Sequence, residues 1–133
     1  MSRLSHMTLG SDKEAPSTHY CLHALQKDLR DFRDERDWAQ FHDPKSLILA
    51  MVGEVGELAE LFQWVPAGEA AALFREGAKK RRASEEMSDV LIYLLGLAQV
   101  LDVDVIAAAR DKLAASIQRF PAADIRGVAP EKR

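Results

Sequence analysis

The sequence predicts an all-α fold, a four-helix bundle with one short connecting helix. Apolar residues recur every three or four positions in four separate segments, which is the spacing of one helix face. No stretch alternates apolar and polar residues with the period of two that a half-buried strand shows. Proline, glycine and aspartate separate the four periodic segments, so we expect short connections between consecutive helices.

The first two helices are predicted from their caps and their apolar stripes. Ser17 or Thr18 can cap a helix that runs to about Trp38. Asp43 is the expected N-cap of the second helix, 44–64, because proline is favoured at the first helical position that follows it. The apolar stripe of the first helix, at helical spacing, consists of Leu22, Leu25, Leu29 and Phe32.

The second half of the chain is predicted in the same way. A short helix is expected over Glu69–Phe74, followed by a solvated loop that contains the basic run Lys79–Arg82. The third long helix is expected over 84–101, with acidic residues in its first turn. A fourth, capped by Asp102 or Asp104, follows and stops at Pro121. The expected organisation is a flexible tail over 1–15, a single all-α domain over 16–122 and a flexible tail over 123–133.

Composition restricts the class of protein. A chain of 133 residues with 47% hydrophobic and 29% charged residues is typical of one globular domain. Its apolar runs are too short to span a membrane, and no secretory signal is evident, so we expect a cytoplasmic protein without a membrane partner. One cysteine excludes an intrachain disulfide. A net charge of −3 argues against binding to a nucleic-acid polymer.

Four acidic residues interrupt the two most apolar stretches. They form the pairs Glu54 and Glu57, and Glu86 and Asp89, each with a spacing of three. On a helix this spacing places both side chains on one face, with Cβ atoms about 5–6 Å apart. Carboxylates are rarely buried without a positive partner, and neither apolar run contains lysine or arginine.

The two pairs therefore predict a metal site between two helices. All-oxygen ligation favours Mg²⁺, with Mn²⁺ as the alternative. Glu-x-x-His, the pattern usual in di-iron bundles, is absent here, so iron is disfavoured. A single Glu-x-x-Glu is more often a solvated helix face; the occurrence of two such pairs in apolar sequence favours the metal.

Other residues suggest a ligand beside the acids. Gly53 and Gly56 flank Glu54, and two glycines within four helical positions suggest that something approaches the backbone closely. Trp38 and Trp64 lie at predicted helix ends, where they either close the core or stack on a nucleobase. Tyr93, two turns after Glu86 on the same face, either points into the metal cavity or packs in the core.

Four segments carry a resemblance to a known family. EVGELAELFQW at 54–64 and EMSDVLIY at 86–93, with ERDWAQFH at 35–42 and RFP at 119–121, resemble the MazG-like all-α nucleoside triphosphate pyrophosphatases, most of all their dCTP pyrophosphatase branch. The resemblance implies Mg²⁺-dependent hydrolysis between the α and β phosphates of a nucleotide, in a homodimer or homotetramer whose subunits complete one another's pockets. It implies that the metal ligands are Glu54, Glu57, Glu86 and Asp89, and that the substrate-binding residues are Trp38, Ala39, Gln40, Phe41, His42, Trp64, Tyr93 and Lys112.

Three positions depart from the pattern of the family. Relatives often carry asparagine four residues after a lysine, whereas Lys112 is followed by Ser116. Phe120 replaces a tyrosine, and Leu29 stands where relatives carry a polar residue, in some a histidine. These changes leave the metal ligands intact and bear on base and sugar preference.

The leading hypothesis is therefore a nucleotide pyrophosphohydrolase. The alternatives are a non-catalytic helical module that binds nucleotides or partners, and a di-metal redox bundle, which the missing histidines disfavour. The intact set of four carboxylates favours the enzyme, because a scaffold would gain stability from apolar residues at these positions.

Overall fold

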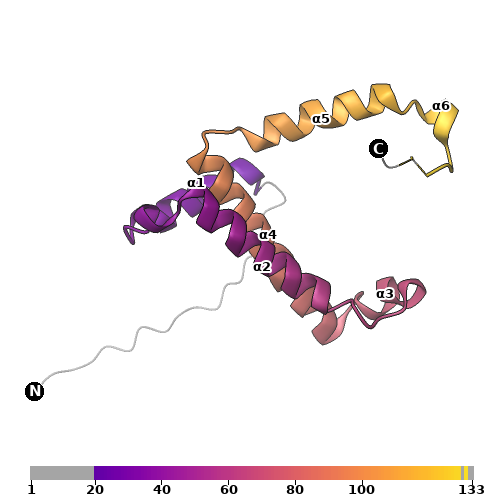
Figure 1. Cartoon of the computed structure of the whole chain (residues 1–133), viewed down its shortest axis with the longest axis horizontal. Coiled ribbons are helices and arrows are strands. Elements are labelled where there is room, and N and C mark those ends of the chain that lie inside the picture. Colours follow the sequence, from indigo (N-terminus) through magenta and orange to yellow (C-terminus); the bar gives the residue numbers. More distant parts are fainter. Residues whose placement is uncertain (1–19, 130, 132–133) are drawn as a thin grey trace, which may run out of the picture.

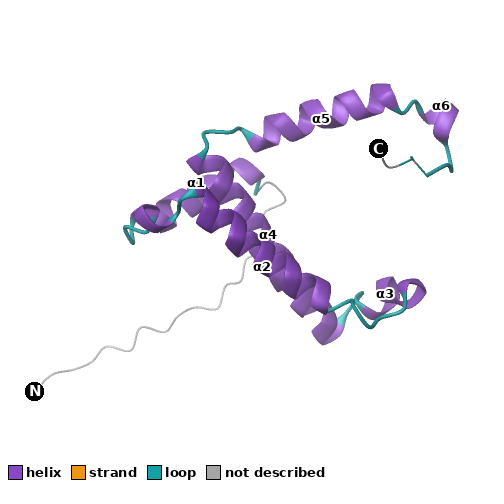
Figure 2. Cartoon of the chain, viewed as in Figure 1, coloured by secondary structure: helices purple, strands orange, loops and turns teal. Residues whose placement is uncertain are grey.

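The computed structural model describes residues 20–129 and 131, and these form helices and loops without a strand (Figure 2). The predicted tail 1–15 and the predicted caps Ser17 and Thr18 lie outside the described residues. The elements in chain order are α1 (Leu22–Asp34), the 3-10 turn η1 (Ala39–Phe41), α2 (Pro44–Glu60), α3 (Ala67–Leu73), α4 (Gly77–Val100), α5 (Val105–Arg119) and α6 (Ala122–Ile125). The all-α prediction is confirmed.

The start of α2 agrees with the prediction, and its end does not. Asp43 accepts a hydrogen bond from the Ser46 backbone N–H at 3.0 Å, and proline occupies the first helical position. The helix ends at Glu60, four residues before Trp64, and the chain then turns. Phe62 in this turn stacks on Phe74 with ring centroids 4.0 Å apart, which holds α3 against the end of α2.

Helix α4 is longer than the sequence predicted. It begins at Gly77, which has a φ of 74°, and not at Ser84. The basic run Lys79–Arg82 is therefore helical, and its prediction as a loop was wrong. Lysine and arginine favour helices, and Ser84 does not interrupt this one because its hydroxyl donates to the Lys80 carbonyl at 2.8 Å.

Helices α2 and α4 form an antiparallel pair, and α1 packs against α4 (Figure 1). Leu47, near the start of α2, lies against Gly96, near the end of α4, whereas Glu57 lies against Glu86. The buried apolar residues are Leu47, Ala83, Leu95 and Ala98. The antiparallel packing brings Glu54 and Glu57 on α2 to the same level as Glu86 on α4.

Helix α5 stands apart from the other long helices. Asp104 caps it, accepting from the Ala107 N–H at 3.0 Å, as one of the two predicted alternatives. The chain bends by 103° between α4 and α5, and α5 then extends away from α1, α2 and α4 (Figure 1). Leu113 and Ile117 on α5 are 62% and 64% exposed. The fourth predicted helix therefore exists, but it does not close a four-helix bundle with the described residues of its own chain.

The last helix of the described chain is a short turn, α6. The helical turn α6, Ala122–Ile125, extends into the segment 123–133 that the sequence predicted as a flexible tail. None of the described helices is by itself long and apolar enough to cross a membrane; α4 and α5 reach that threshold only when taken together across their bend.

Candidate active site

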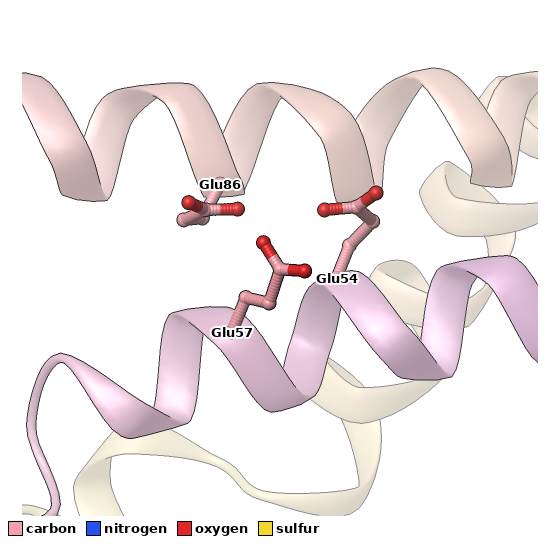
Figure 3. A group of neighbouring side chains, drawn as sticks. All are labelled: Glu54, Glu57 and Glu86. Carbon is pink, nitrogen blue, oxygen red and sulfur yellow. The ribbon is translucent and has the colours of Figure 1, made fainter.

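Three of the four predicted metal ligands come together between α2 and α4. Glu54 and Glu57 extend from α2, and Glu86 extends from α4 toward them (Figure 3). One carboxylate oxygen from each residue lies within 4.8 Å of those of the other two. The spacing of three on α2 directs both of its glutamates to the face that meets α4, as the sequence predicted.

Asp89 lies next to this group. It is exposed, and it lines a pocket together with Glu54, one helical turn from Glu86. Its negative charge is one of the causes that raise the pKa of Glu54. Asp89 is thus placed beside the cluster, on the side that faces the pocket, whereas Glu86 is buried between the helices and Glu57 is exposed.

The cluster is electrostatically unfavourable without a cation. Partial burial raises the pKa of Glu54, and the negative charges of Glu57, Asp89 and Glu86 raise it further. Glu86 is only 3% exposed. These carboxylates lie close together although their negative charges repel one another, an arrangement that suits oxygen ligands of a hard divalent cation.

One side chain of the basic run compensates part of this charge. Arg82 Nη2 lies 3.1 Å from Glu86 Oε1, one turn away on α4, and Arg82 is itself well exposed. The sequence placed this run in a loop and assigned no cation to the acids, so this ion pair corrects that prediction. One arginine does not neutralise four carboxylates, and the cluster retains room for a divalent ion.

A pocket of about 220 Å³ opens beside the carboxylates. Trp38, His42 and Tyr93, all predicted to bind substrate, line it together with Glu54 and Asp89. The Trp38 ring packs edge-on against Phe32, with ring centroids 5.5 Å apart and an interplanar angle of 81°. Acidic and aromatic groups therefore share one pocket, as the sequence predicted.

The middle of the predicted segment 38–42 does not line this pocket. Ala39, Gln40 and Phe41 form η1 and are exposed. Gln40 Nε2 instead donates to the backbone carbonyl and to Oδ2 of Asp37, at 2.9 and 3.0 Å. Asp37 has a φ of 52°, so these bonds stabilise the turn in which Trp38 and His42 face the pocket.

Two other predicted substrate-binding residues lie away from the pocket in this chain. Trp64 follows the end of α2 and is 87% exposed. Lys112 is an exposed residue of α5, the helix that extends away from the acidic cluster. Gly53 and Gly56 also have open space around them, because a Cβ on either would meet nothing within 4 Å in the described chain. None of the described residues therefore packs closely against Gly53 or Gly56.

Sequence reasoning missed one polar wall residue, Arg33. It lines the pocket although it is only 8% exposed. The missed signal was its position, one turn after Leu29 on the inward face of α1, where a charged residue is as unusual as the glutamates of α2.

Comparison with known proteins identifies the family, although no family model matches the chain. Human dCTP pyrophosphatase 1 is 43% identical over 120 residues, which cover 86% of this chain and 71% of the human protein. The rat protein of the same name is 48% identical over 99 residues, or 74% of this chain, and the chain spans only 58% of its length. The crystal structure of a pyrophosphatase from Archaeoglobus fulgidus superposes with a TM-score of 0.68 at 35% identity, covering 81% of this chain and 99% of that one. The chain therefore belongs to the MazG-like all-α nucleoside triphosphate pyrophosphatases, in the branch that contains the dCTP pyrophosphatases.

Proposed function

We propose that this chain is a Mg²⁺-dependent nucleoside triphosphate pyrophosphohydrolase. It hydrolyses a deoxynucleotide such as dCTP between the α and β phosphates and releases a nucleoside monophosphate and pyrophosphate. The observation that supports this proposal is the acidic cluster at the mouth of an aromatic pocket, with Glu54 belonging to both. The names of the relatives support the substrate class.

The residues that would hold Mg²⁺, or Mn²⁺ in its place, are Glu54, Glu57, Glu86 and Asp89. Their oxygen donors match what both ions prefer, and three of them already lie within 4.8 Å of one another. A bound divalent cation would neutralise phosphate charge and lower the pKa of a water. Without it, four carboxylates would repel a triphosphate, so the same residues also make binding depend on the metal.

The remaining wall residues orient the substrate. Phosphoryl transfer needs positioning and charge neutralisation more than a covalent nucleophile. Trp38 and Tyr93 present aromatic surface beside the acids, where a base or sugar can pack while the phosphates face the carboxylates. Cys21, the only cysteine, is exposed at the start of α1 and does not line this pocket.

We also propose that the chain is a homo-oligomer, a tetramer or a dimer. Helix α5 exposes Leu113 and Ile117, and the angle between α4 and α5 holds an apolar hollow lined by Leu94, Leu95, Ile106 and Leu113. A second face of α2 exposes Leu49 and Val52. A second copy would cover this surface and supply the missing helix of the bundle. A mass near 14.8 kDa by light scattering at micromolar concentration would refute this.

One experiment tests the proposed reaction. The purified protein is incubated with the common NTPs and dNTPs and Mg²⁺, and the products are separated by chromatography. We expect dCTP to yield dCMP and pyrophosphate in equal amounts, and EDTA to abolish the reaction. Release of inorganic phosphate together with dCDP would show a different cleavage site. No turnover of any nucleotide with either Mg²⁺ or Mn²⁺ would refute the enzyme proposal.

A further inference from the structure

Arg33 is a buried cation whose hydrogen bonding is incomplete. Its Nη2 donates to Gln99 Oε1, and Gln99 Nε2 donates in turn to the Gln26 carbonyl at 2.5 Å. Its Nε is buried and has no partner among the described residues, and none of the ion pairs in the described part of the chain includes Arg33. A guanidinium removed from water without a carboxylate destabilises the fold unless other acceptors face it. The empty donor position therefore points to an acceptor on a ligand.

The guanidinium lies at the end of the pocket opposite the acids. A Cβ placed on Gly96 would lie 3.6 Å from Arg33 Nη1 and 4.0 Å from Leu47 Cδ2, so Arg33 sits at the level of these two residues. Leu47 precedes Glu54 by seven residues on α2, and Gly96 follows Asp89 by seven on α4. Seven helical residues span about 10.5 Å, so two turns of both helices separate Arg33 from the carboxylates.

A second polar atom without a partner lies in the same pocket. His42 Nδ1 is buried and makes no hydrogen bond to the described chain. Burial and then the positive charge of Arg33 lower the pKa of His42, so its ring is neutral. The other residues that α1 contributes to this wall, Leu29 and Phe32, are apolar. The far end of the pocket is thus apolar, with two polar groups whose hydrogen bonds are left for a ligand.

We propose that Arg33 determines base specificity by donating a hydrogen bond to a carbonyl oxygen of the substrate's nucleobase. The inference rests on the proposed function, which places the phosphates at the carboxylates and hence the base at the other end. A guanidinium is a donor only. It therefore favours bases that carry a carbonyl oxygen, such as cytosine, thymine and uracil, and disfavours adenine, which has none and presents an amino donor.

The competing possibility is that Arg33 binds a phosphate, as arginine often does. A phosphate at Arg33 would lie about two helical turns from the residues proposed to hold the metal. It would also place a dianion among Leu47, Phe32 and Ile92, where apolar walls cannot solvate it. A base at Arg33 avoids both difficulties. It need not lie near the residues proposed to hold the metal, and it is mostly apolar, so it needs only a few polar contacts.

The test measures binding of product fragments without catalysis. Calorimetry in Mg²⁺ compares dCMP with 2-deoxyribose 5-phosphate, which lacks the base, for the wild type and Arg33→Met. Neither ligand has a bond between α and β phosphates, so neither is hydrolysed by the proposed reaction. The matched control is Arg30→Met, the same change at an exposed position of α1 outside this pocket. We expect Arg33→Met to weaken dCMP binding by roughly 10- to 100-fold, to leave the sugar phosphate unaffected and to reduce the preference for dCMP over dAMP.

A spectroscopic readout keeps the test decisive if Arg33→Met fails to fold. The Nε–H signal of Arg33, assigned by its loss in Arg33→Lys, should shift when dCMP is added to the wild type and stay in place with the sugar phosphate. Equal effects of both ligands, or no effect of dCMP on this signal, would overturn the base contact. Wild-type hydrolysis of dCTP is measured in parallel. Turnover with an unmoved Arg33 signal refutes this inference alone, and an Arg33 response to dCMP without turnover refutes the proposed reaction alone.

Discussion

The two ends of the site each contain a buried charged side chain, and the charges are opposite: Glu86 is buried at the acidic end and Arg33 at the other. At the acidic end Glu54, Glu57 and Glu86 face one another between α2 and α4. At the proposed base end, two turns away, Arg33 and Leu47 both lie beside Gly96. Arg82 neutralises only part of the acidic charge, and Arg33 makes no ion pair with the described residues. A nucleotide bound with its phosphates and metal at the acids and its base at Arg33 would complete both ends at once.

The largest expected effect is at the acidic end. Glu57→Gln should lower kcat at least about 100-fold, because Glu57 is a proposed direct ligand of the metal, and loss of residues that only support metal ligands typically costs 10- to 100-fold. KM should change less than kcat, since the residues proposed to contact the base are unchanged. Steady-state kinetics with dCTP and Mg²⁺ measures both constants.

Glu60→Gln is the matched control for this change. Glu60 lies one turn further along α2, is exposed and is outside the cluster. Its variant should keep wild-type kinetics. Comparable losses in both variants would mean that charge on α2, and not ligation by Glu57, controls the rate.

A substitution of Asp89 tests whether this residue belongs to the proposed metal site. Because its carboxylate lies outside the tight group of three, Asp89→Asn should reduce activity by roughly 10- to 100-fold, less than Glu57→Gln does. Raising the Mg²⁺ concentration should recover part of the loss if Asp89 contributes mainly to metal affinity. Activity equal to that of the wild type at all Mg²⁺ concentrations would remove Asp89 from the site.

Trp38 and Trp64 test the base end. Trp38→Ala should raise KM roughly 10- to 100-fold with little change in kcat, since stacking is present before and during the reaction. Trp64 is 87% exposed and outside the pocket of its own chain, so Trp64→Ala acts on binding only if a second copy carries it to the pocket. A raised KM in both variants would support subunits that complete one another's pockets; wild-type KM in Trp38→Ala would remove stacking from the pocket.

The sequence predicted the acidic end better than the base end, and the reason is physical. Two acidic pairs at a spacing of three are a repeated local pattern. Residues three apart lie on the same face of a helix however the helices pack, so this pattern can be read from the sequence. Arg33 is a single residue, and its burial depends on Gly96 and Gln99, more than 60 positions away. No local pattern contains that contact, although a charged residue on the stripe of Leu25 and Leu29 was visible.

The fold shows the same division between local and distant signals. The caps Asp43 and Asp104 are local, and both act as predicted. The direction of α5 is not local, because it depends on the 103° bend after α4, which leaves Leu113 exposed. The domain limits 16–122 and the cytoplasmic location stay predictions from the sequence.

The smallest expected effect concerns stability without metal. The pKa of Glu54 is raised in the folded protein above its ordinary value of 4.5, through burial and then through the neighbouring acids. The folded state therefore binds a proton at Glu54 more readily than the unfolded state does. Its stabilising contribution is present below pH 4.5 and is lost as the pH rises through the raised value. In EDTA at neutral pH, Glu54→Gln should thus melt a few degrees above the wild type.

Excess Mg²⁺ should reverse this order. A ligand that binds only the native state stabilises it, and the wild type has the complete set of carboxylates with which to bind the ion. The wild type should therefore gain more in melting temperature from Mg²⁺ than Glu54→Gln does, when both are measured by thermal unfolding with circular dichroism. Below pH 4.5 the two proteins should melt alike in EDTA, because Glu54 is then protonated in both states. A variant that melts below the wild type in EDTA at neutral pH would show that Glu54 is held by favourable contacts, and the acidic end would then not depend on a cation for its balance.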